Sequence, residues 1–216
     1  MNRKFISIQC ESMNPEFWNN RYASDEWVYG LRENDFLREE ILRVKKESSV
    51  LDLASGEGRN SLFLARQGFS VTAVEQSNVG LDKLKKQSHV ENLKVICIQS
   101  DVLQFKTEQK FDAVVITFLH LPPEQRKVLY RVVYSLLNPE GIFIGEWFHP
   151  DQRAKNYPSG GPENPNLMVT LEELQEEFQN GWRIFRLEHV ERDLDEGEKH
   201  SGRGSLVRIS AQKKKA

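Results

Sequence analysis

The sequence predicts an α/β protein: a single Rossmann-like domain of three layers, whose mostly parallel sheet ends in a C-terminal antiparallel hairpin. Three observations predict this fold. An apolar run at 49–53 leads through a glycine-containing turn into a helical pattern at 59–67. Strand-like and helix-like patterns alternate five times, which is typical of βαβ units. Two strand-like segments, 182–192 and 205–211, then follow one another and predict the hairpin.

The turn after the first strand has the chemistry of a ligand site. Gly56 and Gly58 permit positive φ and let a ligand approach the backbone closely, and open α/β sheets bind ligands at this edge. A dinucleotide fingerprint would have a third glycine where this chain has Ser61. The carboxylates of Asp52 and Glu57 would repel a pyrophosphate but attract an ammonium or sulfonium group. The turn therefore favours S-adenosylmethionine, with a dinucleotide oxidoreductase as the less favoured alternative.

The other elements follow from apolar periodicity and turn residues. Helical spacing places Leu37, Ile41 and Val44 on one face, while the strands read as short apolar runs. Ser77 is a predicted N-cap, and Thr170 opens a capping box before Leu174 and Phe178. The helix at 124–137 is expected to bury Val128, Leu129, Val132, Val133 and Leu136. The remaining predicted segments are helices 34–46 and 77–88 and strands 69–75, 93–98, 111–118 and 142–148.

Two longer connections carry polar and aromatic residues. The segment 149–168 is rich in proline, glycine and asparagine and is longer than an ordinary connection, which indicates a functional loop. The residues 193–204 are expected to form a long hairpin loop between the last two strands, and this loop contains His200 and Arg203. His120 follows the strand at 111–118. The candidate catalytic residues are therefore His200, Arg203 and His120.

The motif at 51–60, Leu-Asp-Leu-Ala-Ser-Gly-Glu-Gly-Arg-Asn, resembles motif I of the class I S-adenosylmethionine-dependent methyltransferases. It is most similar to the branch of the bacterial tellurite-resistance and thiopurine methyltransferases. The resemblance implies S-adenosyl-L-methionine as the cofactor and a seven-stranded sheet in the order 3-2-1-4-5-7-6. It also implies that the aromatic segment Trp18-x-x-Arg21-Tyr22 lies near the cofactor, with Arg21 paired to its carboxylate, although such aromatics equally often serve packing.

Acids at strand ends extend the predicted cofactor site. Glu75 ends the second strand at the interval where nucleotide-binding sheets place an acid for the ribose hydroxyls. Asp101 resembles the family position that recognises the adenine amino group. We expect residues 1–46 to form a helical cap over this site within one domain, 1–216. The full candidate cofactor-binding set is Trp18, Arg21, Tyr22, Asp52, Ala54, Gly56, Gly58, Arg59, Asn60, Glu75, Gln76, Asp101, Val102 and Thr117.

Composition limits the other classes of function. A net charge of −2 over 216 residues gives no sign of a polyanion partner, and the segment before Pro122-Pro123 lacks the acid or amide of enzymes that methylate nucleic-acid bases. Cys10 and Cys97 form neither a disulfide framework nor a zinc site. No apolar run is long enough for a signal peptide or a membrane span. We therefore expect a cytoplasmic monomer or weak homodimer with no metal, nucleic-acid or membrane partner.

The expected activity is methyl transfer to a small-molecule acceptor, with a soft nucleophile (a thiol, selenium or tellurium species) favoured by the resemblance. Trp18, Trp147 and His149 join the candidate catalytic residues around the acceptor. The cationic side chains in this set would suit an oxyanion as the acceptor, and the aromatic side chains would suit a heterocyclic thiol. Arsenite is disfavoured because its methylation relies on several cysteines. The alternative is a non-enzymatic, regulatory module that binds S-adenosylmethionine.

Overall fold

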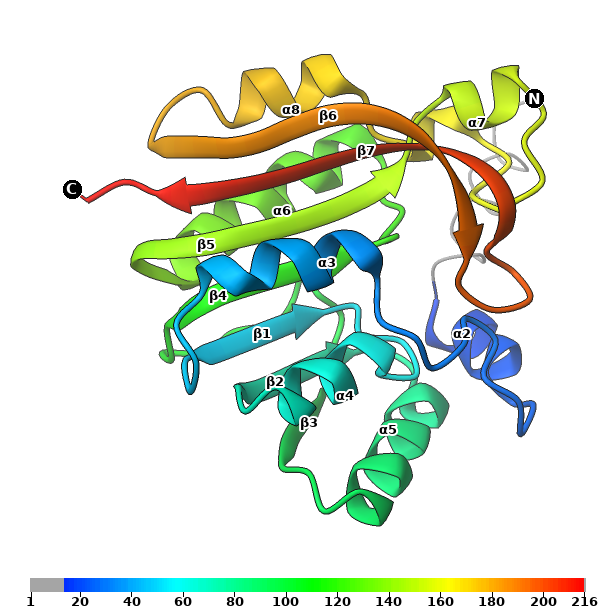
Figure 1. Ribbon diagram of the computed structural model, residues 1–216, viewed down its shortest axis with the longest axis vertical. Coiled ribbons are helices and arrows are strands. Elements are labelled where there is room, and N and C mark those ends of the chain that lie inside the picture. The colour runs from blue at the N-terminus through cyan, green and yellow to red at the C-terminus, as the bar shows by residue number, and fades with distance from the viewer. Residues whose placement is uncertain (1–13, 216) are drawn as a thin grey trace.

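The computed structural model describes residues 14–215 (Figure 1). Seven strands form one sheet in the order β3-β2-β1-β4-β5-β7-β6, which confirms the expected topology. The first five strands are parallel, and β7 runs antiparallel to both β5 and β6. The strands are β1 (Ser49–Leu53), β2 (Ser70–Glu75), β3 (Val95–Gln99), β4 (Phe111–Thr117), β5 (Leu137–Phe148), β6 (Trp182–Asp195) and β7 (Ser201–Lys213).

Helices cover both faces of the sheet and make three layers (Figure 1). One face packs against α3, η1 and α4, whose buried side chains include Phe36, Ile41 and Leu64. The other face packs against α6 and α8 through side chains such as Val133 and Phe178. The helices are α2 (Pro15–Arg21), α3 (Asp35–Glu40), η1 (Ile41–Arg43), α4 (Arg59–Arg66), α5 (Asn78–Val90), α6 (Pro123–Leu136), α7 (Asp151–Ala154), η2 (Pro165–Leu167) and α8 (Leu171–Glu177).

The strand register brings the carboxyl ends of β1, β4 and β5 to one edge. Leu53 is paired with Ile116, and Thr117 with Glu146. Because these strands are parallel, the residues that leave them enter the same region of space. The glycine turn after β1 and the segments after β4 and β5 therefore share one edge of the sheet.

Several predicted elements differ from the observed ones. The helix expected at 34–46 ends at Glu40 and continues as a single 3₁₀ turn, because the chain becomes extended at Val44 to enter β1. Only turns connect β3 to β4, in agreement with the absence of a predicted helix between 98 and 111. Val128 of α6 is exposed and does not join the core.

The terminal hairpin differs most from its prediction. β6 extends to Asp195 and β7 begins at Ser201, so the connection is far shorter than the loop expected at 193–204. Arg203 consequently lies in β7, paired with Asp193 of β6. The expectations for Cys10 and for the first 13 residues of the cap lie outside the described part of the chain. Within residues 14–215, no helix is both long and apolar enough to cross a membrane.

Candidate functional site

The turn after β1 has an unusual backbone. Ala54, Gly56 and Gly58 have φ values of 59°, 58° and 94°. A Cβ on Gly58 would lie 2.4 Å from a methyl carbon of Leu84, so this position requires glycine for space as well as for conformation. The turn is held by the Gly58 amide, which donates to the Ser55 carbonyl at 2.9 Å. The Ser55 hydroxyl has no hydrogen-bond partner among the described residues, and it is a polar group at the turn that a ligand would satisfy.

Asp52 lies beneath this turn and is almost completely buried. The Ser61 hydroxyl donates to its carboxylate at 2.6 Å. Burial raises the pKa of Asp52 to about 7, despite this hydrogen bond. A cationic ligand near the turn would favour the ionised form of this carboxyl group.

Glu75 stands at the end of β2, beside the turn. Its carboxylate accepts from the Gly56 amide at 3.0 Å and from the Ser77 amide at 2.9 Å. Burial raises the pKa of Glu75, while these backbone donors act in the opposite direction. Each carboxylate oxygen has further acceptor capacity, so the residue is suited to receive two neighbouring ribose hydroxyls.

The helix α2 covers the same turn. Trp18 and Tyr22 have stacked rings with centroids 5.6 Å apart, and a Cβ on Gly56 would lie only 3.0 Å from the Tyr22 hydroxyl. The Ser77 hydroxyl donates to the Asn19 side chain at 2.7 Å, which ties α2 to the start of α5. The expected cap is thus divided: α2 lies over the turn, whereas α3 packs on the face of the sheet. The Arg21 guanidinium lies 5.1 Å from the centre of the Phe17 ring.

Two candidate cofactor residues make contacts that join segments of the protein. Asn60 donates to the Thr117 hydroxyl at 2.9 Å and accepts from the Asn34 amide at the same distance. Arg59 donates to Glu196 at 2.7 Å. Their side chains thereby position the turn relative to β4, α3 and the terminal hairpin.

The remaining candidates follow the ends of β2 and β3. Asp101 is exposed, and its carboxylate accepts from the Leu103 amide at 2.8 Å, while Val102 is buried. The Gln76 carbonyl accepts from the Gln99 side chain. These positions line the same carboxyl edge as Glu75.

Glu57 does not play the electrostatic part that the sequence analysis gave it. Its carboxylate lies 2.6 Å from the Lys83 amino group and accepts from the Val28 amide at 3.0 Å. Since Lys83 neutralises it, Glu57 does not itself discriminate against a phosphate. The acidic character of the turn therefore rests on Asp52 and Glu75.

The structure places His200 inside a cage of aromatic rings. Its ring centroid lies 4.4 Å from that of Phe118, 4.6 Å from that of Tyr29 and 5.3 Å from that of Phe148. Phe118 has a φ of 56°, a strained conformation for an aromatic residue that points to a functional constraint. His200 Nδ1 is buried and has no hydrogen-bond partner among residues 14–215, and Glu196 Oε2 lies 4.0 Å from it. Burial, followed by the charge of Arg59, holds the pKa of His200 well below its usual value.

A buried ionic network supports this cage. Glu196 receives Arg59 on one oxygen and Arg192 on the other, each at 2.7 Å. Arg192 also reaches Glu146 at 3.1 Å, and Asn34 donates to the same oxygen of Glu146 at 2.6 Å. Although burial alone would raise it, the two guanidinium groups hold the pKa of Glu196 below its ordinary value. The network thus joins α3, α4, β5 and the terminal hairpin.

The same hairpin touches the N-terminal segment through the backbone. A Cβ on Gly197 would lie 2.4 Å from the Gly30 nitrogen, so two glycines meet without intervening side chains. Both have positive φ, at 66° for Gly30 and 86° for Gly197. This contact closes the side of the cage to which Tyr29 contributes its ring.

The other residues predicted to surround the acceptor differ from His200 in their environment. Trp147 is buried in the core beneath α6 and α8, because its side chain points to the face of the sheet rather than to its edge. Arg203 lies 3.6 Å from Glu191 in an exposed ion pair. His120 is half-buried and stacks on Phe148 with ring centroids 5.9 Å apart, and burial lowers its pKa to about 4. His149 stacks on His189 with ring centroids 3.8 Å apart.

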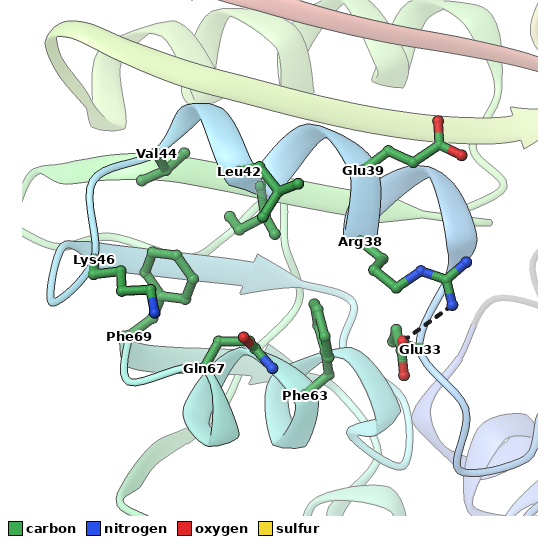
Figure 2. Close-up of a pocket in the computed structure, with 10 residues that line it drawn as sticks. Glu33, Arg38, Glu39, Leu42, Val44, Lys46, Phe63, Gln67 and Phe69 are labelled. Carbon is green, nitrogen blue, oxygen red and sulfur yellow. Dashed lines mark hydrogen bonds and ion pairs between the residues drawn. The ribbon is translucent and has the colours of Figure 1, made fainter.

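Figure 2 shows a separate groove between α3, η1 and α4, with a volume of about 570 Å³. Leu42, Val44, Phe63 and Phe69 contribute apolar side chains to it. Phe69 directly precedes β2, and Val44 lies in the segment between η1 and β1, so this part of the groove lies at the amino ends of the strands. It is therefore distinct from the site around the glycine turn.

Several residues of the site carry no signal in the sequence. Phe118 and Phe148 are recognisable only as the ends of strands, and Tyr29 only as an aromatic residue. Glu196 and Asn34 belong to no motif. A polar residue in the last hairpin and an N-cap residue before α3 become recognisable as partners only after the fold has brought them together.

The glycine turn, the acid ending β2 and the strand order define an α/β protein with a nucleoside-type site at the carboxyl edge of its sheet. Residues 50–141 match the family described as "Methyltransferase domain". The chain thus contains a match to a methyltransferase domain, and its fold is that of the class I S-adenosylmethionine-dependent methyltransferases. Both findings agree with the family resemblance of the motif at 51–60.

Curated relatives show similarity over part of their length. The glycine/sarcosine N-methyltransferase of Halorhodospira halochloris is 31% identical over 136 residues, which are 59% of this chain and 46% of that protein. The probable S-adenosyl-L-methionine-dependent methyltransferase TehB of Haemophilus influenzae is 31% identical over 72 residues, 33% of this chain and 25% of that protein. This chain thus spans less than half the length of either relative.

Solved structures extend the likeness of fold to almost the whole chain. TehB from Haemophilus influenzae superposes with a TM-score of 0.71 and 19% identity, over 93% of this chain and 67% of that one. A structure described as "Conversion of a Disulfide Bond into a Thioacetal Group during Echinomycin Biosynthesis" has a TM-score of 0.75 and 15% identity, over 93% of this chain and 91% of that one. Identities this low establish the fold alone.

Proposed function

We propose that this chain transfers a methyl group from S-adenosylmethionine to a small-molecule acceptor with a soft nucleophile, and that a thiol is the acceptor class that suits the site best. The observation that carries the proposal is the aromatic cage around His200, whose unpartnered Nδ1 lies in a buried setting. The strand register places this cage and the glycine turn at the same edge of the sheet. A cofactor site and an acceptor site would therefore adjoin.

The proposed cofactor site uses the turn and its neighbours. The positive φ values at residues 54, 56 and 58 leave the backbone open to close approach, and Glu75 would accept from the ribose hydroxyls. Asp101 would face the adenine amino group, while Trp18 and Tyr22 would cover the nucleoside. When bound, S-adenosylmethionine supplies a methyl group already activated by its positively charged sulfur.

The character of the cage favours a neutral acceptor over an oxyanion. Of the cations near His200, Arg59 and Arg192 are both paired with Glu196, and Arg21 lies against the Phe17 ring. Aromatic rings exclude water from an apolar sulfur acceptor, and their faces also tolerate a nearby sulfonium through cation–π attraction. These features support a thiol or selenol rather than a tellurium oxyanion.

His200 has a defined part in this proposal. A free thiol has a pKa near 8.5 and is mostly protonated at neutral pH. The depressed pKa keeps the imidazole neutral, so Nδ1 offers a lone pair that receives the S–H proton as the acceptor sulfur becomes nucleophilic. The cage contributes orientation, and well-oriented reactants gain roughly 7–11 kcal/mol of the barrier in this way.

The test has a binding arm and a turnover arm. Calorimetric titration should show binding of S-adenosylmethionine and S-adenosylhomocysteine but not of NADH. Incubation with a thiol, a selenol, tellurite and an amine should release S-adenosylhomocysteine fastest with the thiol or the selenol. Turnover of the amine alone would overturn the acceptor class. Tight cofactor binding with no turnover on any acceptor would indicate a binding module, and NADH binding alone would indicate an oxidoreductase.

A further inference from the structure

Three metal-ligating side chains come together beside, but outside, the site described above. His149 follows the last residue of β5, Asp151 opens α7, and His189 lies within β6. Their ligand atoms all lie within 4.8 Å of one another. In Figure 1, α7 lies near the end of β5 where the terminal hairpin bends over the sheet edge. The fold, not the sequence spacing, makes this cluster.

The distances within the cluster are unsuitable for hydrogen bonds and close to those of a metal site. His149 Nδ1 lies 3.6 Å from Asp151 Oδ1, and His189 Nε2 lies 3.9 Å from Asp151 Oδ2. Neither separation is a hydrogen bond. Ligand atoms about 2.0–2.1 Å from a tetrahedral zinc ion are roughly 3.4 Å apart. Contraction by a few tenths of an ångström would bring these two histidine–carboxylate pairs to that separation.

His149 Nδ1 accepts a hydrogen bond in the structure, and His189 Nε2 lies beside a hydroxyl group that can donate to it. The Asp151 amide donates to His149 Nδ1 at 3.2 Å, so this nitrogen has a lone pair. Ser205 Oγ lies 2.8 Å from His189 Nε2, and a hydroxyl can donate in this arrangement. The stacked rings, inclined by 25°, present both nitrogens to one carboxylate.

One cation already lies beside the cluster, but it has a second partner. The Lys155 amino group lies 3.1 Å from Asp151 Oδ2 and also pairs with Glu191. Because Glu191 can retain Lys155, Asp151 can be released to another cation without leaving the lysine unpaired. Lys155 is therefore a competitor whose removal should strengthen binding of a metal ion.

We propose that His149, Asp151 and His189 form a binding site for a divalent transition-metal ion of the zinc, cobalt or nickel class. Two imidazoles and one carboxylate suit these ions, whereas magnesium and calcium prefer oxygen ligands. The ion links the segment after β5 to β6, directly beside Phe148 of the aromatic cage. This site goes beyond the proposed methyl transfer and does not depend on it.

The test measures metal binding directly. Chelator-treated protein is titrated with Zn²⁺ by calorimetry and with Co²⁺ by visible absorption, which reports imidazole ligation. Wild-type protein should bind one ion. His189→Ala and Asp151→Asn should each weaken binding at least 10-fold, the lower end of the effects seen when even outer-shell partners of a metal are removed. Lys155→Met should tighten it.

A matched control distinguishes binding at this site from nonspecific binding to surface histidines. His89 is exposed on α5, away from the cluster, so His89→Ala should leave the affinity unchanged. Circular dichroism checks that each variant is folded. If either His189→Ala or Asp151→Asn does not fold, the other variant still tests the proposal. Equal affinity in the wild type and His189→Ala, an equal loss in His89→Ala, or no binding at 100 µM ion as an order-of-magnitude ceiling would overturn the proposal.

Discussion

Arg59 and Glu196 form a buried ion pair with a nitrogen–oxygen distance of 2.7 Å. Arg59 is the first residue of α4, directly after the glycine turn, and Glu196 lies in the short connection between β6 and β7. Their side chains are 8% and 2% exposed. The cofactor turn and the hairpin that carries His200 are thus held together by a pair of opposite charges.

Breaking this pair should be strongly destabilising. Glu196→Ala would leave Arg59 buried without its carboxylate partner, and truncation of one member of a buried pair typically costs 3–5 kcal/mol. We expect a loss of about that size in the free energy of unfolding, measured with urea. The exposed neighbour provides the control, since Glu198→Ala should change stability by less than about 0.5 kcal/mol. Similar stability of Glu196→Ala and the wild type would contradict the proposed support.

Asp52 should make stability fall as pH rises. Its pKa is raised to about 7 in the folded protein from an ordinary value of 3.8, so between these values the folded state holds a proton that the unfolded state has lost. The destabilisation grows through this window and is complete above pH 7, reaching at most about 4 kcal/mol at 1.36 kcal/mol per unit. The advantage of Asp52→Asn in thermal melts should therefore grow from pH 4 to pH 7. A constant difference would refute this.

His120 should act in the opposite direction. Burial lowers its pKa from 6.5 to about 4. Below pH 6.5 the unfolded state therefore binds a proton that the folded state does not bind. Stability is lost as pH falls through this window. His120→Gln should flatten the pH dependence of the melting temperature between pH 6.5 and 4.5. A slope identical to that of the wild type would show that His120 titrates normally.

Glu75 should determine cofactor affinity. Glu75→Gln keeps an acceptor for the Gly56 amide but loses the charge that suits the ribose hydroxyls. A hydrogen bond to a charged group contributes roughly 1.5–3 kcal/mol, which corresponds to a loss of S-adenosylmethionine affinity of about 10-fold or more. Calorimetry measures the change, and the exposed Glu108→Gln serves as the control. Unchanged affinity in Glu75→Gln would remove Glu75 from the site.

His200 and Arg203 should now behave differently. His200 lies in the cage, while Arg203 pairs with Glu191 on β6. On an established acceptor, His200→Ala should lower kcat/KM by about 10-fold or more, with cofactor affinity nearly unchanged. Arg203→Ala should remain close to the wild type. Equal losses in both variants would restore Arg203 to the acceptor site that the sequence first predicted.

The sequence predicted the sheet because strand signals are local. Apolar runs such as β1 and β4, and the turn after β1, are recognisable in isolation, and the family resemblance supplied the strand order. The terminal hairpin was harder. Polar residues such as Asp193 and Arg203 looked like loop residues, yet they pair in the ladder between β6 and β7. Cross-strand hydrogen bonds decide such boundaries, and no local pattern reports them.

The site was predictable only where one segment defines it. The turn at 54–58 and the acid at Glu75 followed from motif and spacing. Glu57 was misread because its partner, Lys83, comes from a different helix. The cage around His200 draws on residues from four separate segments, so its composition depends on tertiary contacts alone.

The backbone contact between Gly30 and Gly197 can form only late in the synthesis of the chain. Residue 30 leaves the ribosome long before residue 197, so the strands β1 to β4 are available for pairing while β6 and β7 have not yet been translated. The glycine turn after β1 is therefore present in the nascent chain before the hairpin that carries His200.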